Sequence, residues 1–407
     1  MSAIRDVRLR LVYDSRAHPT VEATVETNSG AIGKASAPSG ASTGAHEVQA
    51  FPTGGVPEAL TTFSSVVRSR LIGLDIGQQL AIDGALHEAD GTPNFAHIGG
   101  NTATAISVAS ALCAATELRK PLWHVLRRPQ VDGKHFPAIV GNCINGGKHA
   151  IGGPDIQEFI AYSSAPDPKD SIRAAIAVHQ AIGEALHKKL PKHALGRGDE
   201  GGWVAPLGNV ESLEVLADAC TKVRDELHLP VHPGLDFAAS EFFGQGRYHY
   251  RDQTVDADGQ LGFVEKLIDR FDLHYVEDPF DQEAFDSFAA LTRAVGTKVP
   301  IVGDDLYTTA KSRVEMGVAK KSTNAVLIKV NQIGTISDTL ATVDYCRAQS
   351  LETVTSHRSG EVPEGWLAQI AVGLGSAALK CGVLGGERVA KLNELLRLGA
   401  AAEHHDA

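Results

Sequence analysis

Five short apolar segments in the second half of the chain each end at or beside a charged residue. The acids at these ends are Asp236, Glu277 and Asp304, and the bases are Lys329 and Lys380. Three carboxylates with no cysteine or histidine among them are typical of a hard, oxygen-ligated cation such as Mg²⁺ rather than zinc. The position of the lysines does not decide their role, because a lysine at a strand end can either face the site or extend into solvent.

The spacing of these residues predicts the elements that position them. In a (β/α)8 barrel the carboxyl ends of the strands meet at one face, so charged strand ends gather there. The predicted strand ends recur roughly 25 to 40 residues apart, as one strand–helix unit per step would give in a barrel of about 250 residues. The sequence therefore predicts an α/β protein whose second half is a barrel.

The first part of the chain has a different pattern. Val21, Ala23 and Val25 alternate with polar residues, which predicts an antiparallel sheet within residues 5–39. Residues 58–127 carry apolar side chains at helical spacing. The polar stretch 129–134 is the predicted linker. We expect an N-terminal α+β capping domain over residues 1–130 and a (β/α)8 barrel catalytic domain over residues 131–407.

Composition excludes several classes of protein. The chain has 407 residues and a formal net charge of -11, which argues against a general binder of nucleic acid or of anionic membranes. No secretory pattern opens the sequence and no apolar stretch approaches the roughly 18 residues of a membrane helix, so a cytoplasmic location is expected. The five cysteines lie singly in apolar surroundings and are predicted to be buried thiols.

Motifs distributed over nearly the whole chain add a family to this picture. In order they are Asp14-Ser15-Arg16, Pro38-Ser39-Gly40-Ala41-Ser42-Thr43-Gly44, Asn145-Gly146-Gly147-Lys148-His149, Gly198-Asp199-Glu200-Gly201-Gly202, Val276-Glu277-Asp278-Pro279-Phe280, Val302-Gly303-Asp304-Asp305, Ile328-Lys329-Val330-Asn331-Gln332 and Ser356-His357-Arg358-Ser359-Gly360-Glu361. Together these resemble the enolase family, the phosphopyruvate hydratases of glycolysis. The resemblance implies an enolase-type barrel with irregular first units.

The resemblance also implies a cofactor and a base. Asp236, Glu277 and Asp304 match the family's metal ligands, Ser42 matches a further one, and two Mg²⁺ ions per active site are expected. Lys329 matches the general base that removes a proton beside the substrate carboxylate. Its apolar strand and the nearby cations are expected to lower its pKa toward neutrality.

A pair of glutamates matches the acid side of the same reaction. Glu200 matches the group that protonates the departing hydroxyl, and Glu158 matches its neighbour. Two carboxylates held close together push one pKa upward, which leaves a proton available for donation. Composition alone would favour an ordinary surface turn at Glu200, because glycines surround it.

The remaining matches concern the substrate. The resemblance implies that Ser42, His149, Arg358 and Ser359 bind the phosphate. An arginine suits this role because its planar fork holds a phosphate through two hydrogen bonds. Lys380 and His357 match groups that face the substrate's carboxylate and hydroxyl. The expected reaction is reversible dehydration of 2-phosphoglycerate to phosphoenolpyruvate.

The chain also departs from the family pattern around its lid loops, at residues 17–18, 48–54, 150–155 and 203–206. An enolase-like dehydration of a phosphonate-bearing analogue, giving carboxyphosphonoenolpyruvate in antibiotic biosynthesis, is therefore the alternative function. A catalytically silent binding protein is disfavoured, because it would not need the glutamates, aspartates and lysines. The resemblance further implies a homodimer or higher homo-oligomer, with Arg10, Glu22 and Arg388 between subunits.

Overall fold

The computed structural model describes residues 1–41 and 43–405, the last three of these by their backbone alone. Its N-terminal part contains the antiparallel sheet that the alternating pattern predicts, in the order β1 (Ile4–Tyr13), β2 (Pro19–Thr27) and β3 (Ile32–Ser36). Val21, Ala23 and Val25 on one face of β2 are fully buried. The helices that follow are α1 (Gly55–Thr62), α2 (Arg68–Leu71), α3 (Gln79–Asp90), α4 (Gly100–Leu118) and α5 (Leu122–Leu126), with a π-helical turn η1 (Phe63–Val67) between α1 and α2.

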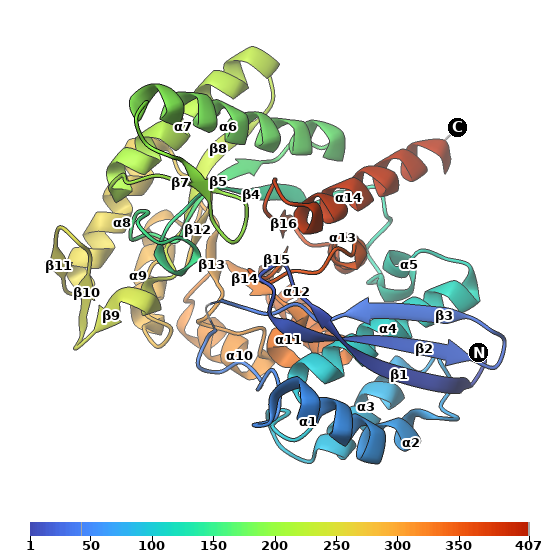
Figure 1. The fold of residues 1–407 in the computed structure, drawn as a ribbon. Coiled ribbons are helices and arrows are strands. Elements are labelled where there is room, and N and C mark those ends of the chain that lie inside the picture. The colour runs from blue at the N-terminus through green and yellow to red at the C-terminus, as the bar shows by residue number, and fades with distance from the viewer. Residues whose placement is uncertain (42, 406–407) are drawn as a thin grey trace.

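Helix α4 joins the N-terminal sheet to the rest of the molecule (Figure 1). It is built largely of Ala, Ser, Thr and Gly, and most of its residues are buried. The sheet approaches it so closely that a Cβ on Gly33 would lie 2.0 Å from the carbonyl oxygen of Ala109. On another side Thr104 Oγ1 donates to the carbonyl of Gly334, 2.9 Å away in the second domain. Small side chains therefore let one helix serve as the interface between the two parts.

The second part is a closed barrel of eight strands. They are β4 (Ala138–Asn145), β5 (Glu158–Ser163), β8 (Val231–Asp236), β12 (Val276–Glu277), β13 (Ile301–Gly303), β14 (Ala325–Ile328), β15 (Glu352–Ser356) and β16 (Ala378–Lys380), and β16 pairs with β4 to close the ring. Strand β5 runs antiparallel to both neighbours, whereas the other barrel pairs are parallel. The predicted fold class, with its irregular first units, is confirmed.

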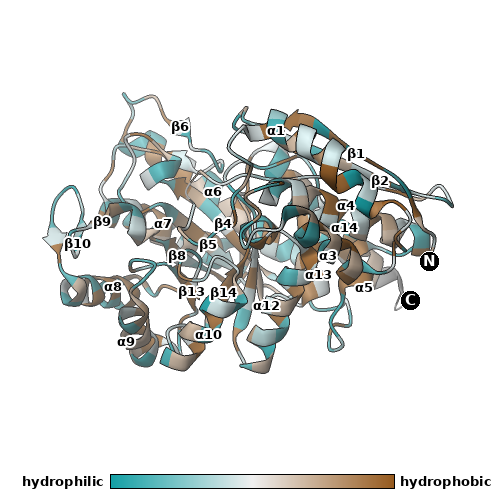
Figure 2. Ribbon diagram, turned by 90° about the horizontal axis from the view of Figure 1, so that it is seen from below, coloured by the Kyte–Doolittle hydropathy of each residue, from teal (hydrophilic) through white to brown (hydrophobic). Residues whose placement is uncertain are grey.

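Helices cover the outside of this barrel. They are α6 (Pro168–Lys189), α7 (Asn209–Leu227), α8 (Ala257–Phe271), α9 (Phe285–Val295), α10 (Lys311–Lys320), α12 (Ile336–Ala348), α13 (Trp366–Leu374) and α14 (Gly386–His405), with the short α11 (Val330–Ile333) directly after β14. Hydrophobic and hydrophilic residues alternate along outer helices such as α8 and α9 (Figure 2), as expected where one face packs on a sheet. Asp167, Asp256 and Thr335 cap the starts of α6, α8 and α12 through their side-chain oxygens.

Shorter elements complete the chain. Strands β6 (Gly196–Arg197) and β7 (Trp203–Val204) extend the barrel sheet beside β4, and β9 (Phe243–Gly244), β10 (Arg247–His249) and β11 (Thr254–Val255) form a separate small sheet. The proposed domain boundary near residue 130 falls in the irregular segment between α5 and β4. No helix in the described residues is both long enough and apolar enough to cross a membrane.

Candidate active site

Strand alternation directs the charged strand ends into the barrel. Ala325 and Leu327 of β14 belong to the apolar cluster inside the barrel, whereas Val326 and Ile328 pack outward against the larger core. Because successive side chains point to opposite faces, Lys329 continues the inward series. The same parity carries Asp236, Glu277, Asp304 and Lys380 inward from their own strands.

The reversed strand β5 contributes through its first residue. Glu158 pairs in register with Asp236, and Asp236 pairs with Glu277, so three carboxylates lie side by side across β5, β8 and β12. Ser356 and Lys380 are likewise opposite each other on β15 and β16. The beginning of an antiparallel strand lies at the same end of the barrel as the ends of its neighbours. Glu158 therefore belongs to the mouth of the barrel.

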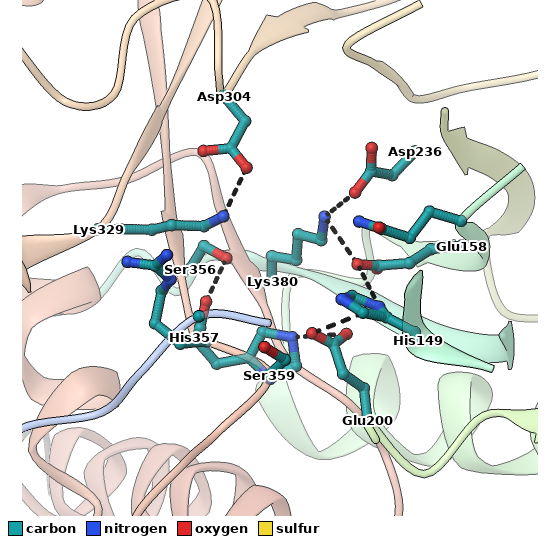
Figure 3. A pocket seen from close by; sticks show the side chains of 13 residues that line it. His149, Glu158, Glu200, Asp236, Asp304, Lys329, Ser356, His357, Ser359 and Lys380 are labelled. Carbon is teal, nitrogen blue, oxygen red and sulfur yellow. Dashed lines mark hydrogen bonds and ion pairs between the residues drawn. The ribbon is translucent and has the colours of Figure 1, made fainter. Parts of the chain in front are cut away.

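Most of the predicted site residues line one cavity at this mouth (Figure 3). Its lining consists of Gly40, His149, Gln157, Glu158, Glu200, Asp236, Asp304, Lys329, Ser356, His357, Arg358, Ser359 and Lys380. Glu277 has no exposed surface and does not line the cavity, but it contacts the lining residue Lys380. Ser42 lies outside the described residues. The structure thus brings together side chains that lie in, or directly after, seven barrel strands with side chains of the barrel loops, and the backbone of Gly40 from the N-terminal part joins them.

Lys380 is the cation that holds the acidic side of the cavity together. Its Nζ lies 2.7 Å from Glu277 Oε1, 2.8 Å from Asp236 Oδ2 and 3.3 Å from Glu158 Oε1. Burial by itself would lower the pKa of Lys380, but the three carboxylates outweigh burial and raise that pKa well above its ordinary value. Lys380 is therefore an ammonium group at neutral pH.

The three predicted metal ligands share one arrangement. A neutral donor fixes one oxygen of each carboxylate: Ala238 N on Asp236 Oδ1 at 2.9 Å, Tyr275 Oη on Glu277 Oε2 at 2.6 Å, and Gln332 Nε2 on Asp304 Oδ1 at 2.9 Å. The other oxygen of each faces a lysine ammonium, Lys380 for the first two and Lys329 for Asp304. Carboxylates anchored in this way by outer partners present their free oxygens to a cation.

The charge of this region also suits a divalent cation. Burial and the neighbouring Asp236 carboxylate raise the pKa of Glu277 to about 8, so the two lysines do not fully compensate the clustered acids. Buried oxygen ligands with excess negative charge are what Mg²⁺ requires. The loop bearing Asp304 is set by Asp278, which accepts from the backbone N–H groups of Asp304 at 2.9 Å and Asp305 at 2.6 Å. The residues present fit the expected metal.

Lys329 does not show the predicted change in pKa. Burial lowers its pKa, but the ion pair with Asp304 outweighs burial, and the pKa is raised above the ordinary value. The prediction of a lowered pKa is wrong for this arrangement, because the nearest charged group is a carboxylate rather than a cation. Lys329 can accept a proton only as the free amine, so Asp304 has to be neutralised by another partner first.

Glu158 and Glu200 form a buried pair beside His149. His149 Nδ1 lies 3.6 Å from Glu158 Oε1 and 3.8 Å from Glu200 Oε1. Burial and the Glu200 carboxylate raise the pKa of Glu158 well above its ordinary range. Burial also acts to raise the pKa of Glu200, but the adjoining His357 and His149 hold it well below that range. The two pKa values are separated as predicted, but the raised one belongs to Glu158 and not to Glu200.

The loop carrying Glu200 is set by polar groups on β4. Asn142 Nδ2 donates to Glu200 Oε2 at 3.0 Å, and Asn145 Oδ1 accepts from Gly202 N at 3.0 Å. A Cβ on Gly202 would lie 2.7 Å from Asn145 Oδ1, so only glycine fits. Asn145 opens one of the motifs of the resemblance, but neither asparagine was predicted as a site residue, although two amides within an otherwise apolar buried strand are a signal that could have been used.

The predicted phosphate side also has a partner that the sequence did not reveal. Arg358 forms a forked ion pair with Glu47, at 3.0 to 3.1 Å, and donates to Asn331 Oδ1 at 2.8 Å. Ser359 Oγ accepts from Ala41 N, which ties the loop after β3 to the barrel. Glu47 stands three residues beyond the motif that ends at Gly44, and it was not predicted as a site residue.

One further cluster of possible metal ligands lies away from the cavity. His232, Asp272 and His274 are close enough to share an ion. The two rings are stacked face to face, 3.6 Å apart and tilted by 13°, so their in-plane lone pairs run side by side and do not converge. Arg224 Nη1 also lies 3.4 Å from His232 Nδ1 and competes for its lone pair. This arrangement is a stacked histidine pair and not a metal centre.

Comparison with known proteins identifies the family. Residues 4–126 match the model "Enolase, N-terminal domain", and residues 134–405 match "Enolase, C-terminal TIM barrel domain". Curated proteins named Enolase are similar over nearly the full length: one from Methanothermobacter thermautotrophicus is 45% identical over 98% of this chain and 96% of its own. The Enolase from Picrophilus torridus is 40% identical over 97% of this chain and 98% of its own. The Enolase from Natronomonas pharaonis is 41% identical over 99% of this chain and 100% of its own. With these matches and the geometry of its barrel mouth, the chain belongs to the enolase family.

Proposed function

We infer that the protein is a carbon–oxygen lyase of the phosphopyruvate hydratase type, which reversibly dehydrates 2-phosphoglycerate to phosphoenolpyruvate with a divalent metal. The observation that carries this function is the convergence, in one cavity, of a lysine base, a glutamate pair and a carboxylate set with the ligand chemistry of Mg²⁺. The relatives that bear the name Enolase support the same reaction over the phosphonate alternative.

The proposed roles follow from position. Lys329 removes the α-proton, and Glu200 assists departure of the hydroxyl on the opposite side of the cavity with Glu158 as the proton-bearing partner. Asp236, Glu277 and Asp304 would hold two Mg²⁺ ions, with Ser42 as a further ligand. Bound there, the cations supply positive charge to the dianionic intermediate, which no single side chain could stabilise.

The remaining cationic and hydroxyl side chains are proposed to bind the substrate. Arg358, Ser359, His149 and Ser42 are proposed to bind the phosphate, and Lys380 and His357 to face the carboxylate and hydroxyl region. A bound phosphate has to displace Glu47 from Arg358 or share the guanidinium with it. A guanidinium that already holds one anion in a bidentate geometry is set in the orientation that a phosphate also uses.

The assembly and location are also proposals. We propose a cytoplasmic homodimer or higher homo-oligomer. Of the three residues expected between subunits, Arg10 is exposed and pairs with Glu22 in the same chain. Arg388 is fully buried inside the chain, so its predicted place between subunits is wrong. Light scattering that shows a monomer would contradict the oligomer.

The test is the ultraviolet absorbance of the enol product after 2-phosphoglycerate is added with Mg²⁺ and then with excess chelator. Rapid turnover that the chelator abolishes is expected. A folded protein that binds metal but turns 2-phosphoglycerate over feebly would contradict the proposal, and the phosphonate analogue would then be the substrate to assay.

A further inference from the structure

Arg388, near the start of α14, connects three parts of the active site from behind. Its side chain has no exposed surface. Its Nη1 lies 2.7 Å from His357 Nδ1 and donates to the carbonyl of Arg358, while Nη2 donates to the carbonyls of Ser359 and, at 3.1 Å, Asp199. One guanidinium thus joins the loop after β15 to the loop that carries Glu200.

The contact between Arg388 and His357 fixes where the histidine carries its proton. A guanidinium has only N–H donors and stays protonated in proteins, so the nitrogen that it contacts has to accept. Gly382 N, a second donor, also points at His357 Nδ1 from 3.4 Å. With Nδ1 accepting, a neutral imidazole carries its proton on Nε2.

The other nitrogen of this ring reaches Glu200. His357 Nε2 lies 3.1 Å from Glu200 Oε2, and the side chains of both residues are at most 3% exposed. An Nε2–H donates to that carboxylate, whereas the opposite tautomer would place a lone pair against the carboxylate oxygen. Because Arg388 can only donate, it sets the direction of both hydrogen bonds: Arg388 donates to His357, and His357 donates to Glu200.

We propose that Arg388 is a positioning residue, which holds His357 as the neutral Nε2–H tautomer and thereby keeps the carboxyl group of Glu200 oriented toward the cavity. This inference rests on the proposed function only through the role of Glu200. Arg388 does not line the cavity and touches no reacting atom.

Three charged groups near His357 determine its response to pH. Glu200 and Arg388 contact the ring directly, and Glu361 lies close enough to add a third charge. Burial first, with Arg388 in addition, lowers the pKa of His357 to about 4, although Glu200 acts against this. The histidine is therefore neutral throughout the neutral range. Without the guanidinium, protonation of His357 moves toward its ordinary range.

The first test needs no variant of Arg388. Nitrogen NMR of ¹⁵N-histidine-labelled protein, with the His357 signals assigned by comparison with His357→Asn, should show an unprotonated Nδ1 and a protonated Nε2 between pH 6 and 8. A protonated Nδ1, or a ring protonated on both nitrogens, would overturn the proposal. This readout does not depend on turnover, so a wild-type protein inactive on 2-phosphoglycerate would contradict the proposed function and leave the tautomer test intact.

The second test compares Arg388→Met, Arg388→Lys and the control Arg397→Met. Arg397 lies on the same helix, is 68% exposed and pairs only with Glu394 among its described ion-pair contacts. Arg388→Met removes a partner that orients a site residue from behind, as the hydrogen-bond partners of metal ligands do, and its kcat is expected to fall about 10- to 100-fold. KM should change less than about threefold, and the acid limb of the kcat profile should move toward higher pH.

The lysine variant separates positioning from folding. Lysine keeps the charge and a donor for Nδ1 but loses the fork that spans the two loops, so Arg388→Lys should recover part of kcat and restore the acid limb. Arg397→Met should match the wild type. A folded Arg388→Met with unchanged kcat and pH profile would overturn the proposal. If Arg388→Met does not fold, the wild-type nitrogen spectrum decides.

Discussion

Lys380→Met is the substitution for which the structure predicts the clearest physical effect. Methionine keeps most of the volume of the side chain but removes the ammonium that lies within 3.3 Å of Glu158, Asp236 and Glu277. Removing one partner of a buried ion pair leaves uncompensated buried charge, which destabilises by about 3–5 kcal/mol. Unfolding of the barrel segment matched at residues 134–405 has an entropy of about 0.6 kcal/mol/K, at about 2.1 cal/mol/K per residue. The expected fall in Tm is therefore about 5–9 °C.

The fall in Tm caused by Lys380→Met should become larger as pH rises. Glu158 and Glu277 have folded pKa values above their unfolded values, and loss of the Lys380 ammonium removes a charge that opposes this rise. The variant is therefore relatively stable while these two carboxyls are protonated and loses stability as pH rises through their folded values. The pKa of Glu277 is already about 8 with Lys380 present. We expect the difference in Tm from the wild type to be small near pH 5 and largest near pH 8 to 9.

The fall in Tm caused by Lys380→Met should also change when Mg²⁺ is added. In the wild type a cation competes with Lys380 for Asp236 and Glu277, so Mg²⁺ should raise the Tm of Lys380→Met by more than that of the wild type. Lys391→Met is the matched control, because Lys391 is equally buried and pairs with Glu361 at 2.6 Å away from the carboxylate set. It should also lower Tm, but without an added response to Mg²⁺. Thermal scans with chelator and with Mg²⁺ test this. A Tm of Lys380→Met within about 2 °C of the wild type at pH 8 in chelator, or a Mg²⁺ response equal to that of Lys391→Met, would refute the reasoning.

Three further predictions concern other groups. Lys329→Ala should lower kcat by about 10²–10⁴-fold while the far-ultraviolet dichroism and metal binding are kept, and retained turnover would refute its role as base. Glu158→Gln removes a carboxyl whose pKa is raised above 4.5 by burial and by Glu200. The Tm of this variant should therefore rise relative to the wild-type Tm as pH increases from about 4.5 into alkaline solution. A Tm difference that stays constant with pH in thermal scans contradicts this. The five cysteines are all buried, and burial raises the pKa of Cys143 to about 12, so a thiol reagent should label none in the native protein and five after denaturation; rapid native labelling would show an exposed thiol.

The sequence was sufficient for the architecture and for most of the cavity lining. Asp236, Glu277, Asp304, Lys329 and Lys380 could be selected because a parallel barrel brings the carboxyl ends of its strands to one mouth, and because alternation of side chains sends those positions inward. Both rules are local in sequence. Glu158 was selected through the family match alone, and only the structure shows that the reversed strand β5 brings it to the mouth.

The tertiary structure decided which groups act on one another. His357 and Glu200 are 157 residues apart, and Arg358 and Glu47 are 311 apart, so no local pattern encodes either pair. The position of the raised carboxyl pKa on Glu158, the raised pKa of Lys329 and the buried place of Arg388 all depend on atom-to-atom distances of about 3 Å. The sequence alone determined which residue types reach the barrel mouth, because strand ends and side-chain alternation follow from backbone geometry. Only the packed structure determined their protonation and partners, because electrostatic and hydrogen-bond energies change over fractions of the distance that separates neighbouring side chains.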